Sequence, residues 1–228
     1  MMSDKDLVSV ILSAYNSENT VEKSINSLLV QTYKNIEILI IDDGSNDKTL
    51  NSIMKFKNEP NIKIFENKKN IGLTKSLNKL IKMSNGKYIA RQDSDDISSP
   101  NRFKRQLEDI KKYDLDFSSS RGYIENTKRK IPRFSYYLPY SFLINYKNPF
   151  IHGTLMIKKN VIEEVGLYDE RFYYAQDYKL MMELIKKGYR YKVIRNPLYK
   201  LNMTNNISTN KKSEQKYYAD CVKNNLNP

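Results

Sequence analysis

Residues 36–47 read Ile-Glu-Ile-Leu-Ile-Ile-Asp-Asp-Gly-Ser-Asn-Asp, a short run that is apolar except for Glu37 and passes directly into a polar turn. The apolar part, Ile36–Ile41, has the composition of a strand buried in a sheet. The segment Gly44-Ser45-Asn46-Asp47 combines a turn glycine with residues that cap helix N-termini. A strand that leads through such a turn into a helix begins a βαβ unit, and this unit sets the expected fold class.

The same alternation continues on both sides of this unit. Further strands are predicted at Val8–Ser13, Ile62–Phe65 and Tyr88–Gln92. Two helices are predicted from apolar spacing, one through Val21, Ile25, Leu28 and Leu29 and one through Leu73, Leu77, Leu80 and Ile81, the second closed by Asn85-Gly86. Strands separated by single helices predict an α/β fold, Rossmann-like, with a mostly parallel central sheet flanked by helices. Ligands gather at the carboxyl ends of the strands in such sheets.

The pattern is less regular after Pro100. Residues 121–149 predict connecting structure with one short helix near Tyr140–Tyr146. Neither a repeat nor a linker divides the chain, so a single domain over residues 1–228 is expected. The other predicted elements are helices at Arg102–Lys112, Val161–Val165 and Asp177–Lys187, strands near Asp116–Ser120, Thr154–Ile157 and Tyr191–Ile194, and a polar, partly helical tail from Asn210.

Composition limits the class of protein. The single cysteine, Cys221, excludes an intramolecular disulfide and a CxxC metal site. No apolar run approaches the roughly 18 residues of a membrane helix, and Val8–Leu12 is too short for a signal-peptide core. A cytoplasmic protein is therefore expected, either free or at the inner face of the plasma membrane. The net charge of +13 either attracts polyanions or reflects the lysine-rich composition alone.

Two acidic groups directly follow predicted strands. Asp42-Asp43 ends the second strand and Asp93-Ser94-Asp95-Asp96 ends the fourth. Carboxylates at alternate positions of an extended segment point the same way, and they repel unless a cation lies between them. Asp93 and Asp95 therefore indicate either a Mg²⁺ or Mn²⁺ site or a solvated turn that caps the helix near Pro100. Asp43 either caps the helix near Asp47 or accepts a hydrogen bond from the imide of a uracil.

Three stretches together resemble the family 2 glycosyltransferases, which have the GT-A fold. They are residues 8–16 (Val-Ser-Val-Ile-Leu-Ser-Ala-Tyr-Asn), 41–45 (Ile-Asp-Asp-Gly-Ser) and 86–96 (Gly-Lys-Tyr-Ile-Ala-Arg-Gln-Asp-Ser-Asp-Asp). The order and spacing match, and the resemblance extends to about Leu201. It implies a nucleotide-sugar-binding half at residues 7–100, an acceptor-binding half at 101–205 and a tail at 206–228.

The resemblance implies specific roles at the donor end. Asp95 is the metal-binding aspartate, for Mn²⁺ or Mg²⁺, and Asp43 binds the base, which favours a UDP-sugar. The remaining nucleotide-sugar-binding residues that the resemblance implies are Ser13, Tyr15, Asn70, Lys75, Asp93 and Ser94. Two of these have a plain structural alternative, because Tyr15 also suits a half-buried core position and Lys75 a solvent-facing helix position.

The acceptor half carries the catalytic group that the resemblance implies. Asp177 aligns with the aspartate that acts as base in inverting members of the family, although it could also cap the following helix. Gln176 stands where the family usually has glutamate, which keeps the base but removes a neighbouring charge. His152, the only histidine, lines the sugar pocket or has a structural role, and it is not interpreted as a metal ligand.

The expected function is therefore metal-dependent, inverting transfer of a sugar, of the hexosyltransferase type, from a UDP-sugar to an acceptor hydroxyl. The acceptor class expected is a glycan or glycolipid of surface polysaccharide synthesis, and the basic surface suits peripheral membrane association. One alternative is a nucleotidyltransferase, but the chain lacks its glycine-rich N-terminal loop. Another is a basic nucleic-acid-binding protein, for which Lys128-Arg129-Lys130 and Lys211-Lys212 are the best clusters.

Overall fold

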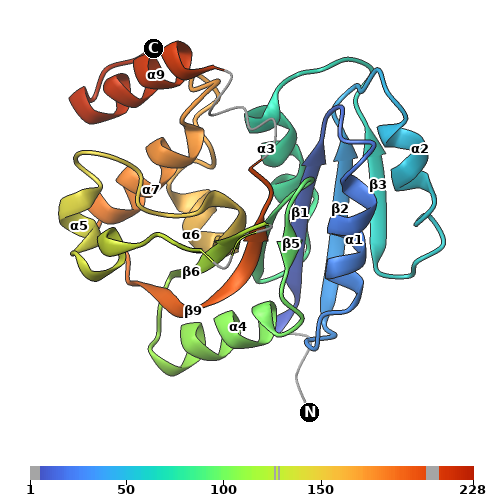
Figure 1. Cartoon of the computed structure of the whole chain (residues 1–228), viewed down its shortest axis with the longest axis horizontal. Helices are drawn as coiled ribbons and strands as arrows, with labels where there is room; N and C mark the ends of the chain where they lie inside the picture. Colours follow the sequence, from blue (N-terminus) through green and yellow to red (C-terminus); the bar gives the residue numbers. More distant parts are fainter. Residues whose placement is uncertain (1–5, 126, 128, 204–210) are drawn as a thin grey trace.

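A nine-stranded mixed sheet with helices on both faces forms the centre of the described part of the chain (Figure 1). A computed structural model describes residues 6–125, 127, 129–203 and 211–228. The strand order is β3-β2-β1-β4-β8-β6-β9-β5, and β7 pairs with β6 outside this path. The result confirms the predicted α/β class.

The N-terminal part is the predicted run of βαβ units. Four strands are parallel to one another, and α1, α2 and α3 connect them in turn. The elements are β1 (Val8–Ala14), α1 (Val21–Leu29), β2 (Ile36–Asp42), α2 (Thr49–Met54), β3 (Ile62–Glu66), α3 (Leu73–Met83) and β4 (Tyr88–Asp93). Because β1 lies between β2 and β4, the carboxyl ends of three neighbouring strands meet at one edge of the sheet.

The C-terminal part completes the sheet with strands of both directions. β8 runs antiparallel to β4 and β6, whereas β9 is parallel to β6 and antiparallel to β5. The elements are β5 (Ile97–Ser98), α4 (Arg102–Lys112), β6 (Phe117–Ile124), β7 (Lys130–Ile131), α5 (Tyr140–Leu143), β8 (Met156–Lys158), α6 (Lys159–Glu164), α7 (Gln176–Lys186), β9 (Tyr191–Leu201) and α9 (Lys212–Asn224), with 3₁₀ turns at Phe134–Tyr137 and His152–Thr154.

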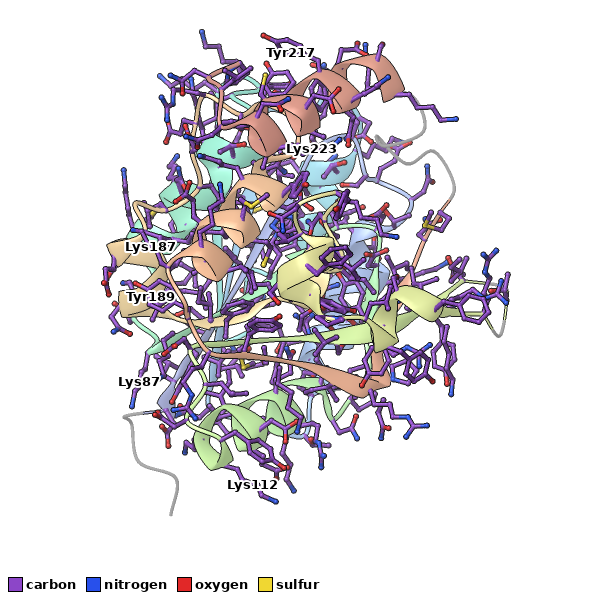
Figure 2. All side chains as sticks on the ribbon, turned by 90° about the vertical axis from the view of Figure 1, so that its left-hand side faces the viewer. Lys87, Lys112, Lys187, Tyr189, Tyr217 and Lys223 are labelled. Atoms are coloured by element: carbon purple, nitrogen blue, oxygen red, sulfur yellow. The ribbon has the colours of Figure 1, made fainter. Side chains whose placement is uncertain are left out.

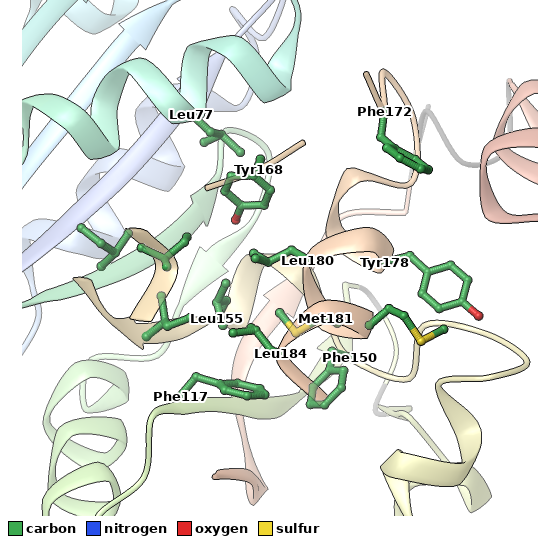
Figure 3. Close-up of a cluster of buried hydrophobic side chains, with 14 of the residues drawn as sticks. Leu77, Phe117, Phe150, Leu155, Tyr168, Phe172, Tyr178, Leu180, Met181 and Leu184 are labelled. Atoms are coloured by element: carbon green, nitrogen blue, oxygen red, sulfur yellow. The ribbon is translucent and has the colours of Figure 1, made fainter. Parts of the chain in front are cut away.

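Alternate residues of β1 supply two hydrophobic cores, one on each face of the sheet. Val8, Val10 and Leu12 pack with α1, α2 and α4, whereas Ile11 packs on the other face with α3, α6 and α7. Figure 3 shows part of this second core, in which Leu77 of α3 lies across from Leu180 and Leu184 of α7. All seven residues of β1 are buried, as expected for a strand covered on both faces.

Several predicted boundaries differ from the structure. The strand predicted at Thr154–Ile157 begins at Met156, because residues 152–154 form a 3₁₀ turn. Asn85-Gly86 does not close α3, whose C-cap is Ser84. Gly86 instead permits a close contact between segments, since an added Cβ would lie 2.5 Å from Oγ of Ser9.

Part of the sequence expectations falls on residues outside the described ranges. These are the first five residues, Lys128 of the basic cluster, and residues 206–210 of the tail. The described part of the tail contains α9, which confirms the prediction of a partly helical tail. Within the residues that are described, no helix has both the length and the apolar character needed to cross a membrane.

Candidate active site

The ends of β1 and β2 place the predicted nucleotide-binding residues side by side. Ala14 and Asp42 are paired across the two parallel strands, and the N–H of Asp43 donates to the carbonyl of Ala14 at 2.8 Å. Ser13 is buried at the end of β1, whereas the next residue but one, Tyr15, is 45% exposed. Tyr15 is therefore not a core tyrosine, and its ring is accessible at the carboxyl edge of the sheet.

Asp43 is buried and organises the loop that precedes α3. Its Oδ1 accepts hydrogen bonds from Nδ2 of Asn67 at 2.8 Å and from the N–H of Ile71 at 3.1 Å. Its Oδ2 accepts from the N–H of Gly72 at 3.0 Å. The alternative that Asp43 caps the helix near Asp47 is wrong, because the N–H of Thr49 at the start of α2 donates to Asp47 itself.

The loop and helix that follow carry the other two predicted donor contacts. Asn70 and Lys75 are both exposed. Tyr173, from the C-terminal half, lies against this loop, since a Cβ added to Gly72 would be 3.0 Å from its ring. Burial raises the pKa of Tyr173, and the nearby Tyr174, Asp43 and Tyr15 raise it further. Tyr173 therefore lies beside the predicted base-binding residues, although the sequence did not single it out.

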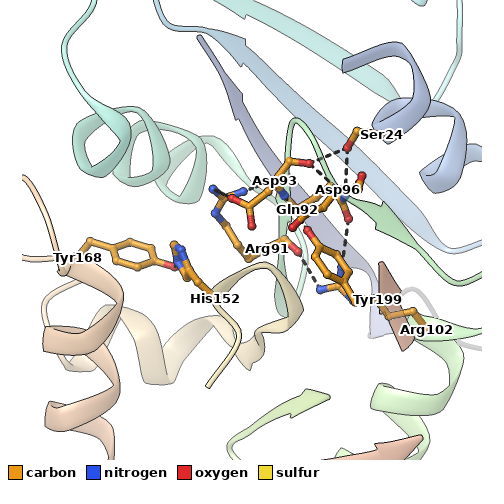
Figure 4. Close-up of polar contacts among 9 residues, drawn as sticks. All are labelled: Ser24, Arg91, Gln92, Asp93, Asp96, Arg102, His152, Tyr168 and Tyr199. Carbon is orange, nitrogen blue, oxygen red and sulfur yellow. Dashed lines mark hydrogen bonds and ion pairs between the residues drawn. The ribbon is translucent and has the colours of Figure 1, made fainter. Parts of the chain in front are cut away.

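Asp93, at the end of β4, is held by residues from across the molecule (Figure 4). Its Oδ1 pairs with a guanidinium nitrogen of Arg91 at 2.6 Å, and its N–H donates to the hydroxyl of Tyr199 at 3.0 Å. Its carbonyl accepts from Oγ of Ser24 at 2.7 Å. Gly153 approaches the same carboxylate, because an added Cβ would lie 2.4 Å from Oδ2 of Asp93.

Asp95 and Asp96 are acidic groups in a poorly solvated place. Burial and the charge of Asp93 raise the pKa of Asp95 to about 6. Burial and the charges of Asp93 and Asp95 raise the pKa of Asp96 to about 9, although its Oδ1 accepts a hydrogen bond from the N–H of Asn202 at 2.7 Å. The alternative that this turn caps α4 is wrong, because the N-cap residue of that helix is Asn101 and the N–H of Phe103 in its first turn donates to Oε1 of Gln31.

Two buried arginines, Arg91 and Arg102, pack beside this acidic turn. Arg102 is fully buried and donates to Oε1 of Gln92, to Oγ of Ser98 and to the carbonyl of Arg91. Its guanidinium also lies 5.0 Å from the ring centroid of Tyr199. Arg91 directly follows the apolar residues Tyr88–Ala90, and a charge in that place is the signal by which a sequence search could have found it. Arg102 begins a helix rich in charged residues, so no local signal marks it.

Asp177 lies in the first turn of α7 and faces a residue from the preceding connection. Its Oδ2 accepts a hydrogen bond from Nδ2 of Asn148 at 2.7 Å. The N-cap position is occupied by Ala175 in a left-handed conformation (φ 54°), so Asp177 is not the cap of the helix. Gln176, at the position of the family's usual glutamate, is buried.

His152 is within the electrostatic influence of both Asp93 and Asp177. Its Nε2 is 2.8 Å from the hydroxyl of Tyr168. Burial and the charge of Arg91 lower the pKa of His152, whereas the charges of Asp177 and Asp93 act in the opposite direction. The same three charged residues act on Tyr168, whose pKa is raised chiefly by burial. The charges of Asp93 and Asp177 therefore both act on one His152–Tyr168 pair, although the two aspartates lie 84 positions apart in the sequence.

The comparisons with known proteins identify the class. Residues 9–166, more than half of the chain, match the family described as Glycosyl transferase family 2. The chain therefore belongs to glycosyl transferase family 2. This membership favours the glycosyltransferase interpretation over the nucleotidyltransferase and the nucleic-acid-binding protein.

Two relatives illustrate the similarity in sequence. An uncharacterized glycosyltransferase of Haemophilus influenzae is 34% identical over 82% of this chain, which spans 62% of that relative. The Escherichia coli enzyme named UDP-Glc:alpha-D-GlcNAc-diphosphoundecaprenol beta-1,3-glucosyltransferase WfaP is 33% identical over 80% of this chain and 72% of its own length.

Solved structures establish the GT-A fold. TarS of S. aureus in complex with UDP-GlcNAc superposes with a TM-score of 0.76 at 23% identity, covering 87% of this chain and 59% of that one. The mannosyltransferase PcManGT of Pyrobaculum calidifontis, in complex with GDP-Man and Mn²⁺, gives a TM-score of 0.72 at 18% identity and covers 92% of this chain and 61% of that one. This chain thus spans about three fifths of the length of these structures.

Proposed function

We propose that this protein transfers a sugar from a UDP-sugar to an acceptor hydroxyl with inversion at the anomeric carbon. One observation carries the proposal: the charges of Asp93, at the end of β4, and of Asp177, at the start of α7, both act on the same His152–Tyr168 pair. A donor at the carboxyl ends of β1, β2 and β4 would present its anomeric carbon between these aspartates.

The donor end fits a nucleotide. Tyr15 offers an accessible ring on which a base can stack, and Tyr173 offers a second ring next to the same loop. Oδ2 of Asp43 accepts one hydrogen bond within the protein and keeps a lone pair for the imide N–H of uracil. Ser13, Ser94, Asn70 and Lys75 complete the proposed set. UDP-GlcNAc and UDP bound to TarS support a uridine donor.

The acidic turn fits a divalent cation. Asp93 and Asp95 provide hard oxygen donors, and burial disfavours two neighbouring carboxylates unless a cation balances them. Within the described ranges no three His, Cys, Asp or Glu side chains form a complete metal site, so diphosphate oxygens would complete the coordination shell. A cation held by Asp95 would supply Lewis-acid stabilisation of the departing diphosphate.

The acceptor end fits general base catalysis. Asp177 would accept the proton of the attacking hydroxyl, and Asn148 orients its carboxylate through a 2.7 Å hydrogen bond. A single displacement opposite the leaving diphosphate inverts the anomeric carbon, so an α-linked donor gives a β-linked product. The substrate in the name of WfaP, a diphosphoundecaprenol glycan, supports a lipid-linked acceptor in surface polysaccharide synthesis.

Asp177→Asn tests the proposed base. The amide keeps an oxygen for Asn148 but cannot take a proton, so transfer should fall by about 10²–10⁴-fold while the affinity for UDP is unchanged. Release of UDP from a panel of UDP-sugars in the presence of lipid-linked acceptors measures the first quantity, and calorimetry the second. Asp114→Asn is the control, because Asp114 is 79% exposed and has a left-handed backbone that asparagine tolerates. Near-normal transfer by Asp177→Asn eliminates this base.

Asp95→Ala tests the metal site separately. In the unaltered protein Mn²⁺ should strengthen UDP binding, because the cation bridges the carboxylate and the diphosphate. The variant should lose this increase and keep the metal-free affinity, and titrations of UDP with and without Mn²⁺ measure both. A variant that retains the full effect of Mn²⁺ would place the cation elsewhere.

A further inference from the structure

The connection between β6 and η3, the 3₁₀ turn at His152–Thr154, is strongly basic. From Asn126 to Pro149 the sequence has five basic residues and no acidic one, and the next acidic residue is Glu163. Within the described ranges, Arg129, Lys130, Arg133 and Lys147 form no ion pair. The charge of this segment is therefore uncompensated by nearby carboxylates, and the proposed transfer chemistry does not use it.

The same segment exposes large apolar side chains. Phe134 is 79% exposed, Tyr137 67%, Phe142 56% and Tyr146 63%. They belong to η2, the 3₁₀ turn at Phe134–Tyr137, and to α5 and its end. Figure 1 places α5 on the outer left of the molecule, and Figure 2 looks onto that side. A cluster of exposed aromatic rings on a protein surface indicates an interaction site.

A cavity of about 480 Å³ lies in this surface, and every charged residue that lines it is basic. The lining residues are Arg121, Arg129, Lys130, Arg133, Phe134 and Tyr137. Arg121 comes from β6 and is only 9% exposed, and its Nε is buried without a hydrogen-bond partner. Its guanidinium lies 4.8 Å from the ring centroid of Tyr136. Among the described residues it forms no ion pair. A buried, unpaired cation is costly unless an anion accompanies it.

We propose that the surface of Arg121 and Arg129–Tyr146 docks on an anionic membrane, with a lipid phosphate in the cavity beside Arg121. The basic side chains attract the anionic headgroups, while Phe134, Tyr137 and Phe142 enter the boundary between headgroups and acyl chains. Nucleic acid would satisfy the cations but leave the exposed aliphatic and phenyl groups, such as Leu138 and Phe142, without an apolar environment.

This surface is continuous with the acceptor end of the candidate site. Asn148, which follows the segment, donates to Asp177, and the hydroxyl of Tyr178 in α7 donates to the carbonyl of Ile144 at 2.6 Å. Docking would therefore hold Asp177 near the membrane, where a lipid-linked acceptor is located. Only this consequence rests on the proposed function; the membrane surface itself does not.

Vesicle sedimentation with the whole protein tests the proposal without donor or acceptor. Vesicles of equal parts phosphatidylcholine and phosphatidylglycerol are compared with pure phosphatidylcholine at about 0.1 M salt, where the Debye length is about 10 Å. The unaltered protein should prefer the anionic vesicles. The triple variant Arg129→Gln, Lys130→Gln, Arg133→Gln should lose on the order of a hundredfold in affinity, at about fivefold for each basic residue.

A matched triple variant separates a local surface from the overall charge. Lys23→Gln, Lys57→Gln, Lys104→Gln removes three exposed lysines from other faces and should keep most of the affinity. Phe134→Ser, Phe142→Ser should weaken binding to the anionic vesicles, whereas Val30→Ser, Met54→Ser, which removes two other exposed apolar side chains, should not. Circular dichroism and the thermal midpoint establish that each variant is folded.

Two outcomes would overturn the proposal. Equal losses in both triple variants would show that only net charge matters. A stable dimer that both segment variants dissociate would assign the surface to a second copy of the chain. Because UDP binding and transfer are measured separately, loss of vesicle binding with intact transfer is distinguishable from failure of the proposed function.

Discussion

Gly153 shows how closely the acidic turn is packed at the scale of a single residue. A Cβ at this position would lie 2.4 Å from Oδ2 of Asp93 and 2.4 Å from the hydroxyl of Tyr199. Gly153→Ala must therefore displace a residue of the candidate donor site, at a cost of about 1–3 kcal/mol in stability. We expect release of UDP from the donor to slow by on the order of 10²-fold, because misplacement of reacting groups by about 1 Å has that effect.

Gly188→Ala provides the comparison for this prediction. Gly188 has φ 78° and nothing within 4 Å of an added Cβ. An L-residue in that conformation costs about 1–2 kcal/mol, so both variants should lose similar stability in urea denaturation. Only Gly153→Ala should lose donor turnover. Equal turnover in the two variants would show that the contact between Gly153 and Asp93 has no functional consequence.

The residues of the candidate site differ in how far the sequence could predict them. Asp43, Asp95 and Asp177 lie in or beside motifs that the sequence displays locally, and their placement at strand ends and at a helix start follows from short-range patterns. Tyr199 and Tyr173 reach the site only through tertiary packing, which no local pattern encodes. Whether Ser13, Ser94, Asn70 and Lys75 contact the donor stays a prediction.

Glu37 connects elements of the N-terminal half through a single side chain. It accepts hydrogen bonds from Oγ of Ser9 in β1 at 2.6 Å, from the N–H of Asn85 at 2.6 Å and from Nζ of Lys63 in β3 at 2.9 Å. Burial alone would raise the pKa of Glu37, but these donors outweigh it and lower the pKa to about 2. The ionised carboxylate thus joins three neighbouring strands and the loop after α3.

Glu37→Gln should destabilise the fold in a pH-dependent way. Because the folded pKa lies below the unfolded value near 4.5, the contribution of the carboxylate is complete above that pH and is lost as the pH falls toward 2. We expect a loss of about 2 kcal/mol at pH 7 that shrinks to about half or less by pH 3. Urea denaturation across this range measures it, with exposed Glu66→Gln as the control. A difference independent of pH would contradict the role of the charge.

Secondary-structure elements were predictable where one period dominates the sequence. The helix predicted at Arg102–Lys112 coincides with α4, and the four parallel strands coincide with the strands predicted at Val8–Ser13, Ile36–Ile41, Ile62–Phe65 and Tyr88–Gln92 to within one residue at their ends. The segment 121–149 lacks a period because its short elements are held by tertiary contacts, such as β7 on β6. β9 continues to Leu201 through Pro197, seven residues beyond the predicted end, because an irregularity in its pairing with β6 accommodates the proline.

At the scale of the whole molecule, the donor is expected to join the N-terminal and C-terminal halves of the chain. The first half contributes Tyr15 and Asp43 from the ends of β1 and β2. The second contributes Tyr173, whose ring lies against Gly72 and next to both of those residues. A nucleotide bound there would contact both halves at once and hold Tyr173 over the loop that Asp43 organises.

Tyr173→Ala tests whether the C-terminal half takes part in nucleotide binding. If the ring stacks on the base or closes over it, its removal should weaken UDP binding by about tenfold, within the roughly 1–3 kcal/mol that such contacts contribute. Tyr217→Ala is a close match, because Tyr217 is 55% exposed and Tyr173 54%, but Tyr217 lies on α9. Calorimetric titration with UDP should therefore separate the two variants. Equal affinities would confine the nucleotide to the N-terminal half, since an exposed tyrosine that touches no ligand can be removed without cost to binding.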